Sequence, residues 1–90
     1  MVYTIKRIRW LMDMLQIGQR FIAMELDISL SALQNYLNGK TILHRRMFEI
    51  ACTNILNTYM DVHNIDHDFD PLNGFQFTVE IAGIKWVCPY

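Results

Sequence analysis

The 90-residue sequence predicts a mainly α domain of four helices followed by a C-terminal two-stranded antiparallel β-hairpin. Two patterns along the chain predict this fold. Up to about residue 60, apolar residues recur at steps of three and four, which is the period of a helix that buries one face. From residue 75 onward they take every second position, which is the period of a strand. Ninety residues suffice for one hydrophobic core, so the hairpin is expected to be a packing or dimerisation element of the same domain.

Composition narrows the class of protein. With 52% hydrophobic and 19% charged residues, the chain is expected to fold rather than to stay disordered. No apolar run approaches the roughly 20 residues that span a bilayer, and the first residues lack the layout of a secretion signal. We therefore expect a cytoplasmic protein with no membrane contact. Cys52 and Cys88 lie in unrelated contexts, so both are interpreted as buried small hydrophobic residues and not as disulfide partners or zinc ligands.

The formal net charge of -1 conceals an uneven distribution. Residues 1–50 carry seven basic and four acidic side chains, a net charge of +3, whereas residues 51–90 carry one basic and five acidic side chains, a net charge of -4. The basic residues of the first half are Lys6, Arg7, Arg9, Arg20, Lys40, Arg45 and Arg46. This half has the charge needed to face the phosphates of a nucleic acid.

The first two helices are predicted from periodicity and from the residues that flank it. An amphipathic helix is predicted over residues 4–16, with Thr4 as its N-terminal cap. Gly18 interrupts the pattern, and a second helix follows over residues 19–26. The apolar face of the first helix consists of Ile5, Ile8, Leu11, Met12 and Leu15.

A tight corner at residues 27–29 leads into a third helix over residues 30–37. Asn38 and Gly39 are expected to close this helix with a left-handed C-cap. A fourth helix is predicted over residues 43–60, with Arg45, Arg46 and Glu49 on its polar face. Its apolar positions are Leu43, Met47, Phe48, Ile50, Ala51, Ile55, Leu56 and Tyr59.

Residues 61–74 are interpreted as an acidic connector, because they are polar and contain two turn signals, Asp-Pro at 70–71 and Asn-Gly at 73–74. Asp66, Asp68 and Asp70 imitate the start of a calcium-binding loop. However, Pro71 stands where that loop needs glycine, and Phe77 stands where it needs its closing glutamate. A solvated connector without a metal is therefore expected.

Residues 75–90 predict a hairpin because one register satisfies both of its faces. With residues 82 and 83 as a two-residue turn, Glu80 lies opposite Lys85, and Thr78 lies opposite Val87. Ala82 is the weak point, since hairpin turns favour residues that tolerate a positive φ. The apolar pairs predicted on the other face are Ile81 with Ile84, Val79 with Trp86, Phe77 with Cys88, and Phe75 with Tyr90. Because this face is strongly apolar, it must cover either the helices of the same chain or the same hairpin in a second subunit.

Residues 19–39 have the features of two helices that cross closely. A small residue is needed at the nearest approach, and Ala23 lies four residues into the second helix. The positions that must fill the crossing are all apolar, namely Ile22, Leu26, Ile28, Leu33 and Tyr36. In its spacing from Gln19 to Asn38-Gly39 and its YLNGK ending, this stretch resembles the helix-turn-helix of the lambda repressor and Cro-like DNA-binding family. EIACTNIL at residues 49–56 is similar to the helix that follows there. The resemblance covers about residues 4–58 and leaves the hairpin unmatched.

The resemblance implies that the third helix enters the major groove of double-stranded DNA. The amides of Gln34 and Asn35 can bond an adenine edge, and Ser31 can bond a base or a phosphate. The base-contact positions that the resemblance assigns are Ser29, Leu30, Ser31, Gln34 and Asn35. In the family the position of Gln19 bonds a phosphate, and we expect the same role for Asn38, Lys40, Arg45 and Arg46.

Three residues depart from the family pattern. Asp27 holds the corner that is usually glycine, at an expected cost of about 1 kcal/mol. Phe21 replaces a polar surface residue, which indicates that something covers this side of the second helix. Leu30 cannot hydrogen-bond a base edge, although it can contact a thymine methyl group.

The sequence thus predicts a repressor-like, sequence-specific transcription regulator of the kind found in phages and mobile elements, acting as a homodimer. The alternative is a protein-interaction module, anti-defence or antitoxin-like, that keeps the helix-turn-helix fold. Such a module would bind another protein through the acidic half and the hairpin. No Gly-rich phosphate loop, nucleophile with a neighbouring base, or carboxylate pair supports an enzyme, and no cofactor is expected.

Overall fold

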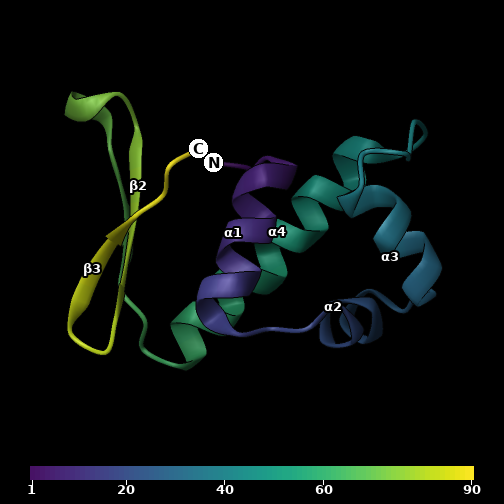
Figure 1. Cartoon of the computed structure of the whole chain (residues 1–90), viewed down its shortest axis with the longest axis horizontal. Coiled ribbons are helices and arrows are strands. Elements are labelled where there is room, and N and C mark those ends of the chain that lie inside the picture. The colour runs from purple at the N-terminus through teal and green to yellow at the C-terminus, as the bar shows by residue number, and fades with distance from the viewer. The chain divides into compact units, whose positions relative to one another are not determined.

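The computed structural model describes residues 1–90 and contains four α-helices, one short 3-10 helix and three strands (Figure 1). The helices are α1 (Ile5–Leu15), α2 (Gln19–Leu26), α3 (Leu30–Leu37) and α4 (Arg45–Val62), and the 3-10 helix is η1 (Pro71–Asn73). The strands are β1 (His67–Asp70), β2 (Gln76–Ile81) and β3 (Ile84–Val87). The predicted fold class, mainly α with a small C-terminal β part, is confirmed. The chain divides into two compact units, Met1–Leu56 and Asn57–Tyr90.

Side-chain hydroxyl groups cap the N-termini of α1 and α3. The Thr4 hydroxyl accepts a hydrogen bond from the N–H of Arg7 at 3.3 Å and caps α1 as predicted. The Ser29 hydroxyl caps α3 in the same way by accepting from the N–H of Ala32 at 3.1 Å. At the other end of α3, Gly39 takes the left-handed conformation, with a φ of +73°, that lets the chain turn away.

The unit Met1–Leu56 buries one face of each of its first three helices. A buried threonine ties the N-terminal segment to α4, because the Thr53 Oγ1 accepts from the N–H of Tyr3 at 2.9 Å and donates to the carbonyl of Glu49 at 2.7 Å. The ring of Tyr36 stacks on Phe48 at a centroid distance of 5.0 Å and joins α3 to α4. The buried apolar residues of this unit are Tyr3, Ile8, Leu11, Met12, Leu15, Ile17, Ile22, Ala23, Leu33, Tyr36, Leu37, Cys52 and Leu56.

The predicted start and apolar face of the fourth helix were partly wrong. α4 begins at Arg45 and not at residue 43, because His44 takes a left-handed φ of 61° and separates Leu43 from the helix. Leu43 and Met47, expected on the buried face, are 75% and 65% exposed, and Ile50 is also exposed. The helix also continues two residues further than predicted, to Val62.

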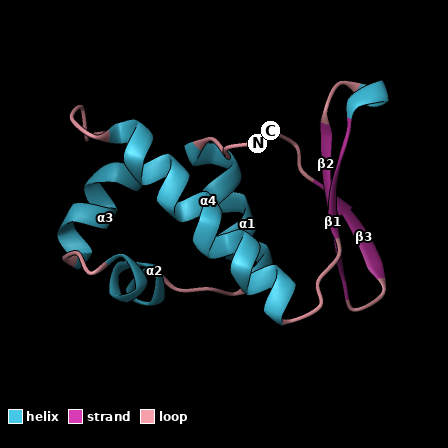
Figure 2. Cartoon of the chain, turned by 180° about the vertical axis from the view of Figure 1, so that it is seen from behind, coloured by secondary structure: helices cyan, strands magenta, loops and turns pink.

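The acidic connector was another error of the sequence prediction, because its residues 67–70 form β1. The sheet is therefore three-stranded and antiparallel, in the order β1-β2-β3, and not a two-stranded hairpin (Figure 2). His67 pairs with Val79 and Phe69 with Phe77, and the two phenyl rings lie 4.9 Å apart. Alternation in "HDFD" places His67 and Phe69 on the apolar face of the sheet and leaves two aspartates on the other.

The predicted register of the hairpin is confirmed. β2 and β3 pair Ile81 with Ile84, Val79 with Trp86, Glu80 with Lys85, and Thr78 with Val87. The N–H of Cys88 donates to the carbonyl of Phe77 at 2.8 Å, as the next predicted pair requires. Ala82 and Gly83 form the two-residue turn with φ angles of 54° and 76°, so Ala82 does adopt the unfavourable left-handed conformation.

The last predicted pair, Phe75 with Tyr90, is not part of the ladder. Phe75 has a φ of 57° and precedes β2, whereas Tyr90 follows the end of β3. Within the predicted apolar face, Phe77 and Val79 are buried and Ile81 is partly buried. Ile84, Trp86, Phe75 and Tyr90 are exposed, so half of this face remains open to solvent.

Candidate nucleic-acid interface

The helices α2 and α3 are held against each other by the residues that the sequence placed at their crossing. Ala23, Leu33 and Tyr36 are buried. Asp27 takes a left-handed φ of 55°, and the N–H of the following Ile28 donates to the carbonyl of Ala23 at 3.0 Å. Together these contacts produce a tight three-residue corner between two short helices. Leu26 and Ile28 are half-buried at its edge.

The outward face of α3 presents polar side chains that serve no structural role. Gln34 and Asn35 lie three and four residues after Ser31, so all three lie on the same side of α3. All three are exposed, and their side chains make no hydrogen bond within the chain. The hydroxyl of Ser29 differs, since its oxygen accepts the capping bond from Ala32, which leaves one lone pair to accept and its proton to donate.

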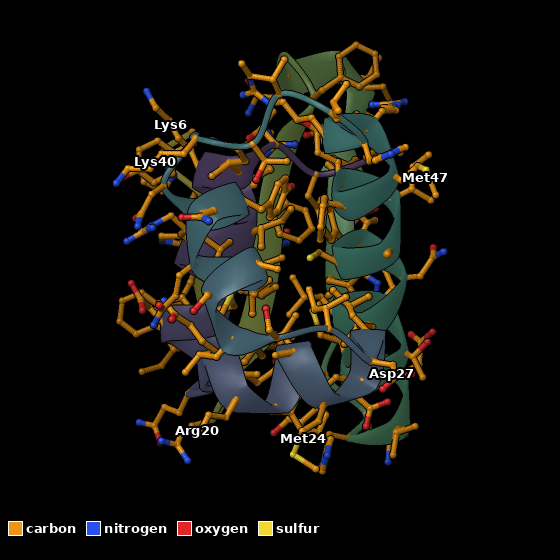
Figure 3. All side chains as sticks on the ribbon, turned by 90° about the vertical axis from the view of Figure 1, so that its right-hand side faces the viewer. Lys6, Arg20, Met24, Asp27, Lys40 and Met47 are labelled. Carbon is orange, nitrogen blue, oxygen red and sulfur yellow. The ribbon has the colours of Figure 1, made fainter.

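Leu30 connects this polar face to an apolar depression. Its side chain is half-buried and lines a shallow hollow together with Ala23, Met24 and Ile28, beside Arg20. Figure 3 shows Arg20 and Met24 projecting from the outer side of α2. The sequence did not indicate a packing partner for Leu30. In the structure, Leu30 lies beside residues of α2 and of the turn that follows it.

Of the predicted phosphate contacts, Gln19 at the start of α2 lines a depression, together with Arg9, the acidic Asp13 and Leu37 at the end of α3. The guanidinium of Arg9 donates to the carbonyl of Leu37 at 3.0 Å and to the Oδ1 of Asn38 at 3.3 Å. Because the Asn38 oxygen is occupied by Arg9, its amide N–H groups are the part left to donate to a phosphate.

Sequence reasoning missed the contribution of α1 to this side of the molecule. Arg9 reaches the end of α3 across 28 residues of sequence, and Lys6 lies on the same side as the exposed Lys40 (Figure 3). The net positive charge of residues 1–50 was the only sequence signal for such a cluster, and it does not indicate which cations come together.

Arg45 and Arg46 open α4, as predicted, but they share one carboxylate. The Nε of Arg45 lies 3.7 Å from the Oε1 of Glu49, and the Nη1 of Arg46 lies 3.4 Å from the Oε2 of the same side chain. Both arginines are largely exposed, so these ion pairs are weak and leave the donors accessible to solvent. Even so, Glu49 offsets about half of their combined charge.

The two units carry opposite charge. The unit Met1–Leu56 contains the seven basic and four acidic residues counted in the first half of the sequence, a net charge of +3. The unit Asn57–Tyr90 has a net charge of -4, from one basic and five acidic residues. Three of these acidic residues, Asp68, Asp70 and Glu80, lie in β1 and β2, and Asp66 directly precedes β1. Only the first unit has a charge that suits a nucleic acid.

The structure gives little support to a metal site or to a membrane-spanning helix. No group of three or more His, Cys, Asp or Glu residues is placed to hold a metal ion. None of the helices has the length and apolar composition needed to cross a membrane. The two groups with displaced pKa values are internal: burial raises the pKa of Cys52 to about 11, and burial also raises that of Tyr36, with Cys52 and Glu49 adding to the effect.

Comparison with known proteins returned no matching family model, curated protein or solved structure. The function of the α2–α3 unit therefore has to be inferred from its own geometry and charge.

Proposed function

We propose that the protein is a sequence-specific, DNA-binding transcription regulator that places α3 in the major groove. The observation that carries the proposal is the face of Ser31, Gln34 and Asn35, which is exposed, polar and free of internal hydrogen bonds. Side-chain amides in such a position can read an adenine edge by two hydrogen bonds. The cations of Arg9 and Lys40 lie at the C-terminal end of α3 and supply attraction to the DNA backbone.

The proposed roles follow from position. Ser29, Leu30, Ser31, Gln34 and Asn35 contact bases, with Leu30 contributing an apolar surface. Gln19, Asn38, Lys40, Arg45 and Arg46 contact phosphates, and Arg9 joins them by fixing the amide of Asn38. The regulator is cytoplasmic and repressor-like, of the kind encoded by phages and mobile elements. It acts as a homodimer, which presents two copies of α3 to two half-sites.

The direct test is selection of bound fragments from random duplex DNA. We expect enrichment of a defined motif, and we expect Gln34→Ala with Asn35→Ala to abolish preference for that motif at fixed salt. Asn54→Ala with Thr58→Ala is the matched control, because it changes two exposed polar residues of α4 to which no DNA contact is assigned. Unchanged discrimination in the first double variant, or no enrichment by the native chain, would refute the proposal.

A second candidate function is a protein-interaction module, anti-defence or antitoxin-like, that keeps the fold and does not bind DNA. The observation that favours it is an exposed apolar stripe before and along the start of α4, formed by Ile42, Leu43, Met47 and Ile50. An apolar patch of this kind is typical of a protein contact. Absence of DNA enrichment, together with loss of a partner upon Met47→Glu, would favour this candidate.

A further inference from the structure

The strand β3 forms one of the two edges of the sheet, because the strand order is β1-β2-β3 (Figure 1, Figure 2). All four of its residues are exposed. Three are apolar, with exposed fractions of 54% for Ile84, 42% for Trp86 and 48% for Val87. An open edge that combines apolar side chains with unused backbone groups is a surface on which another strand can pair.

The ladder fixes which backbone groups of β3 face outward. The N–H of Cys88 donates to the carbonyl of Phe77, so this pair and every second pair along the two strands exchange hydrogen bonds. The residues in between, Lys85 and Val87, turn their N–H and C=O groups away from β2. These four groups are not used within the sheet.

We propose that β3 pairs with β3 of a second copy of this chain, in an antiparallel two-fold arrangement centred on Trp86. The inference rests on the proposed dimer and is independent of DNA contact. In this register Lys85 of each copy exchanges two backbone hydrogen bonds with Val87 of the other copy, which gives four hydrogen bonds in all. The two Trp86 side chains face each other at the closer, non-hydrogen-bonded spacing on the apolar side of the sheet.

Neighbouring registers are weaker for reasons of charge and backbone chemistry. A shift that puts Lys85 on the two-fold axis brings two ammonium groups directly opposite each other. A shift that puts Val87 on the axis pairs Lys85 with Pro89, which has no N–H to donate. The register centred on Trp86 uses every outward group of both strands.

The opposite edge of the sheet, β1, disfavours the same pairing. Asp66, Asp68 and Asp70 alternate along it, so two copies of β1 would place carboxylates opposite one another. In contrast, β3 carries the single charge of Lys85, which Glu80 already faces across the ladder. The distribution of charge therefore directs a second copy to β3.

The first test measures the dimer dissociation constant by sedimentation equilibrium of the full chain without DNA. Val87→Pro removes one outward N–H from each copy and so two of the four hydrogen bonds, while the N–H that it removes takes no part in the β2–β3 ladder. We expect the dissociation constant to rise at least about tenfold, with an unchanged circular-dichroism spectrum. Val87→Thr keeps the N–H and is the control, expected within about threefold of the native chain.

The second test determines the register by oxidative cross-linking. Trp86→Cys places two thiols across a non-hydrogen-bonded pair, and we expect a covalent dimer. Lys85→Cys is displaced from its counterpart and should cross-link far less. The native chain is the blank, because Cys52 and Cys88 are buried. Preferential cross-linking of Lys85→Cys would overturn the register.

Three further results would overturn the pairing of β3 itself. They are a native chain that is monomeric at roughly 50 µM, open-ended assembly beyond the dimer, and a Val87→Pro dimer as tight as the native one. The first would also remove the proposed dimer, whereas the last would leave a dimer formed elsewhere. None of the three tests base contact by α3, which the fragment selection tests separately.

Discussion

Leu30 is the residue at which the apolar and polar parts of the candidate interface meet. α2 and the turn hold its side chain beside Ala23, Met24 and Ile28. It lies one turn before Gln34 on α3, so its exposed edge adjoins the polar face. An apolar edge in the major groove matches the methyl group of thymine, the one apolar feature that a base pair presents there.

This position leads to a prediction about DNA chemistry. Replacing a thymine of the selected motif by uracil removes only its methyl group, and at the thymine that Leu30 contacts we expect about fourfold weaker binding. Leu30→Ala should bind the two DNAs alike in a fluorescence anisotropy titration. A thymine outside the protected region serves as the control. If Leu30→Ala still distinguishes thymine from uracil, another side chain reads the methyl group.

Cys52 makes the stability of the protein depend on alkaline pH. Its pKa is about 11 in the folded chain, above the ordinary value of 9.0, because burial disfavours the thiolate. The neutral thiol therefore contributes stability below pH 9.0, and this contribution is lost as the pH rises toward 11. We expect the free energy of unfolding, measured in urea, to fall across this range.

The Cys52→Ala variant is the control for that titration. It should be less stable at neutral pH because it leaves a small cavity, and its stability should fall less steeply above pH 9.0. Some decline will remain, since burial also raises the pKa of Tyr36. Parallel curves for the native chain and Cys52→Ala would rule out Cys52 as the source.

At the scale of secondary-structure elements, the sequence predicted those features that depend on local patterns of residues. The register of β2 and β3 was predictable because the Glu80–Lys85 pair and the Val79–Trp86 pair point to the same alignment. β1 was not predicted, because its alternation extends over four residues and two of them are aspartates, which are depleted in strands. Its stabilising contact, Phe69 on Phe77, joins residues that only the folded chain brings together.

The turn between β2 and β3 leads to a prediction about the hairpin. Ala82 has a φ of 54°, which suits asparagine better than alanine, and glycine already follows it. Ala82→Asn should therefore stabilise the chain by about 0.5–1 kcal/mol in thermal or urea unfolding. Ala32→Asn is a matched control within α3, where helical φ makes the same change destabilising. A loss of stability in Ala82→Asn would contradict the turn geometry.

At the scale of the whole molecule, the cluster of cations was the least predictable part of the candidate interface. The charge count indicated a basic half, but the contact of Arg9 with Leu37 and Asn38 depends on how α1 packs against the end of α3. Such a contact spans 28 and 29 residues and leaves no periodic signal in the sequence. In the same way, the sharing of Glu49 by Arg45 and Arg46 became apparent only in the structure.

The distribution of charge predicts how DNA binding should respond to salt. Lys40 is exposed and makes no ion pair, so Lys40→Ala should reduce the slope of log affinity against log salt by about one. Arg45→Ala should reduce it less, because Glu49 already offsets part of that charge. Lys85→Ala, in the acidic unit, is the control and should leave the slope unchanged. Equal slopes for the Lys40 variant and the native chain would exclude Lys40 from phosphate contact.

The residues of α3 that pack against the core differ from those that are exposed, and this separation has a consequence for evolution and for engineering. Leu33, Tyr36 and Leu37 hold the helix in place, while the side chains of Ser31, Gln34 and Asn35 make no hydrogen bond to the rest of the chain. Exchanges at such exposed positions usually change folding free energy by less than about 0.5 kcal/mol. If these side chains read DNA, operator preference can drift, or be reprogrammed in a small library, without eroding the fold that displays it.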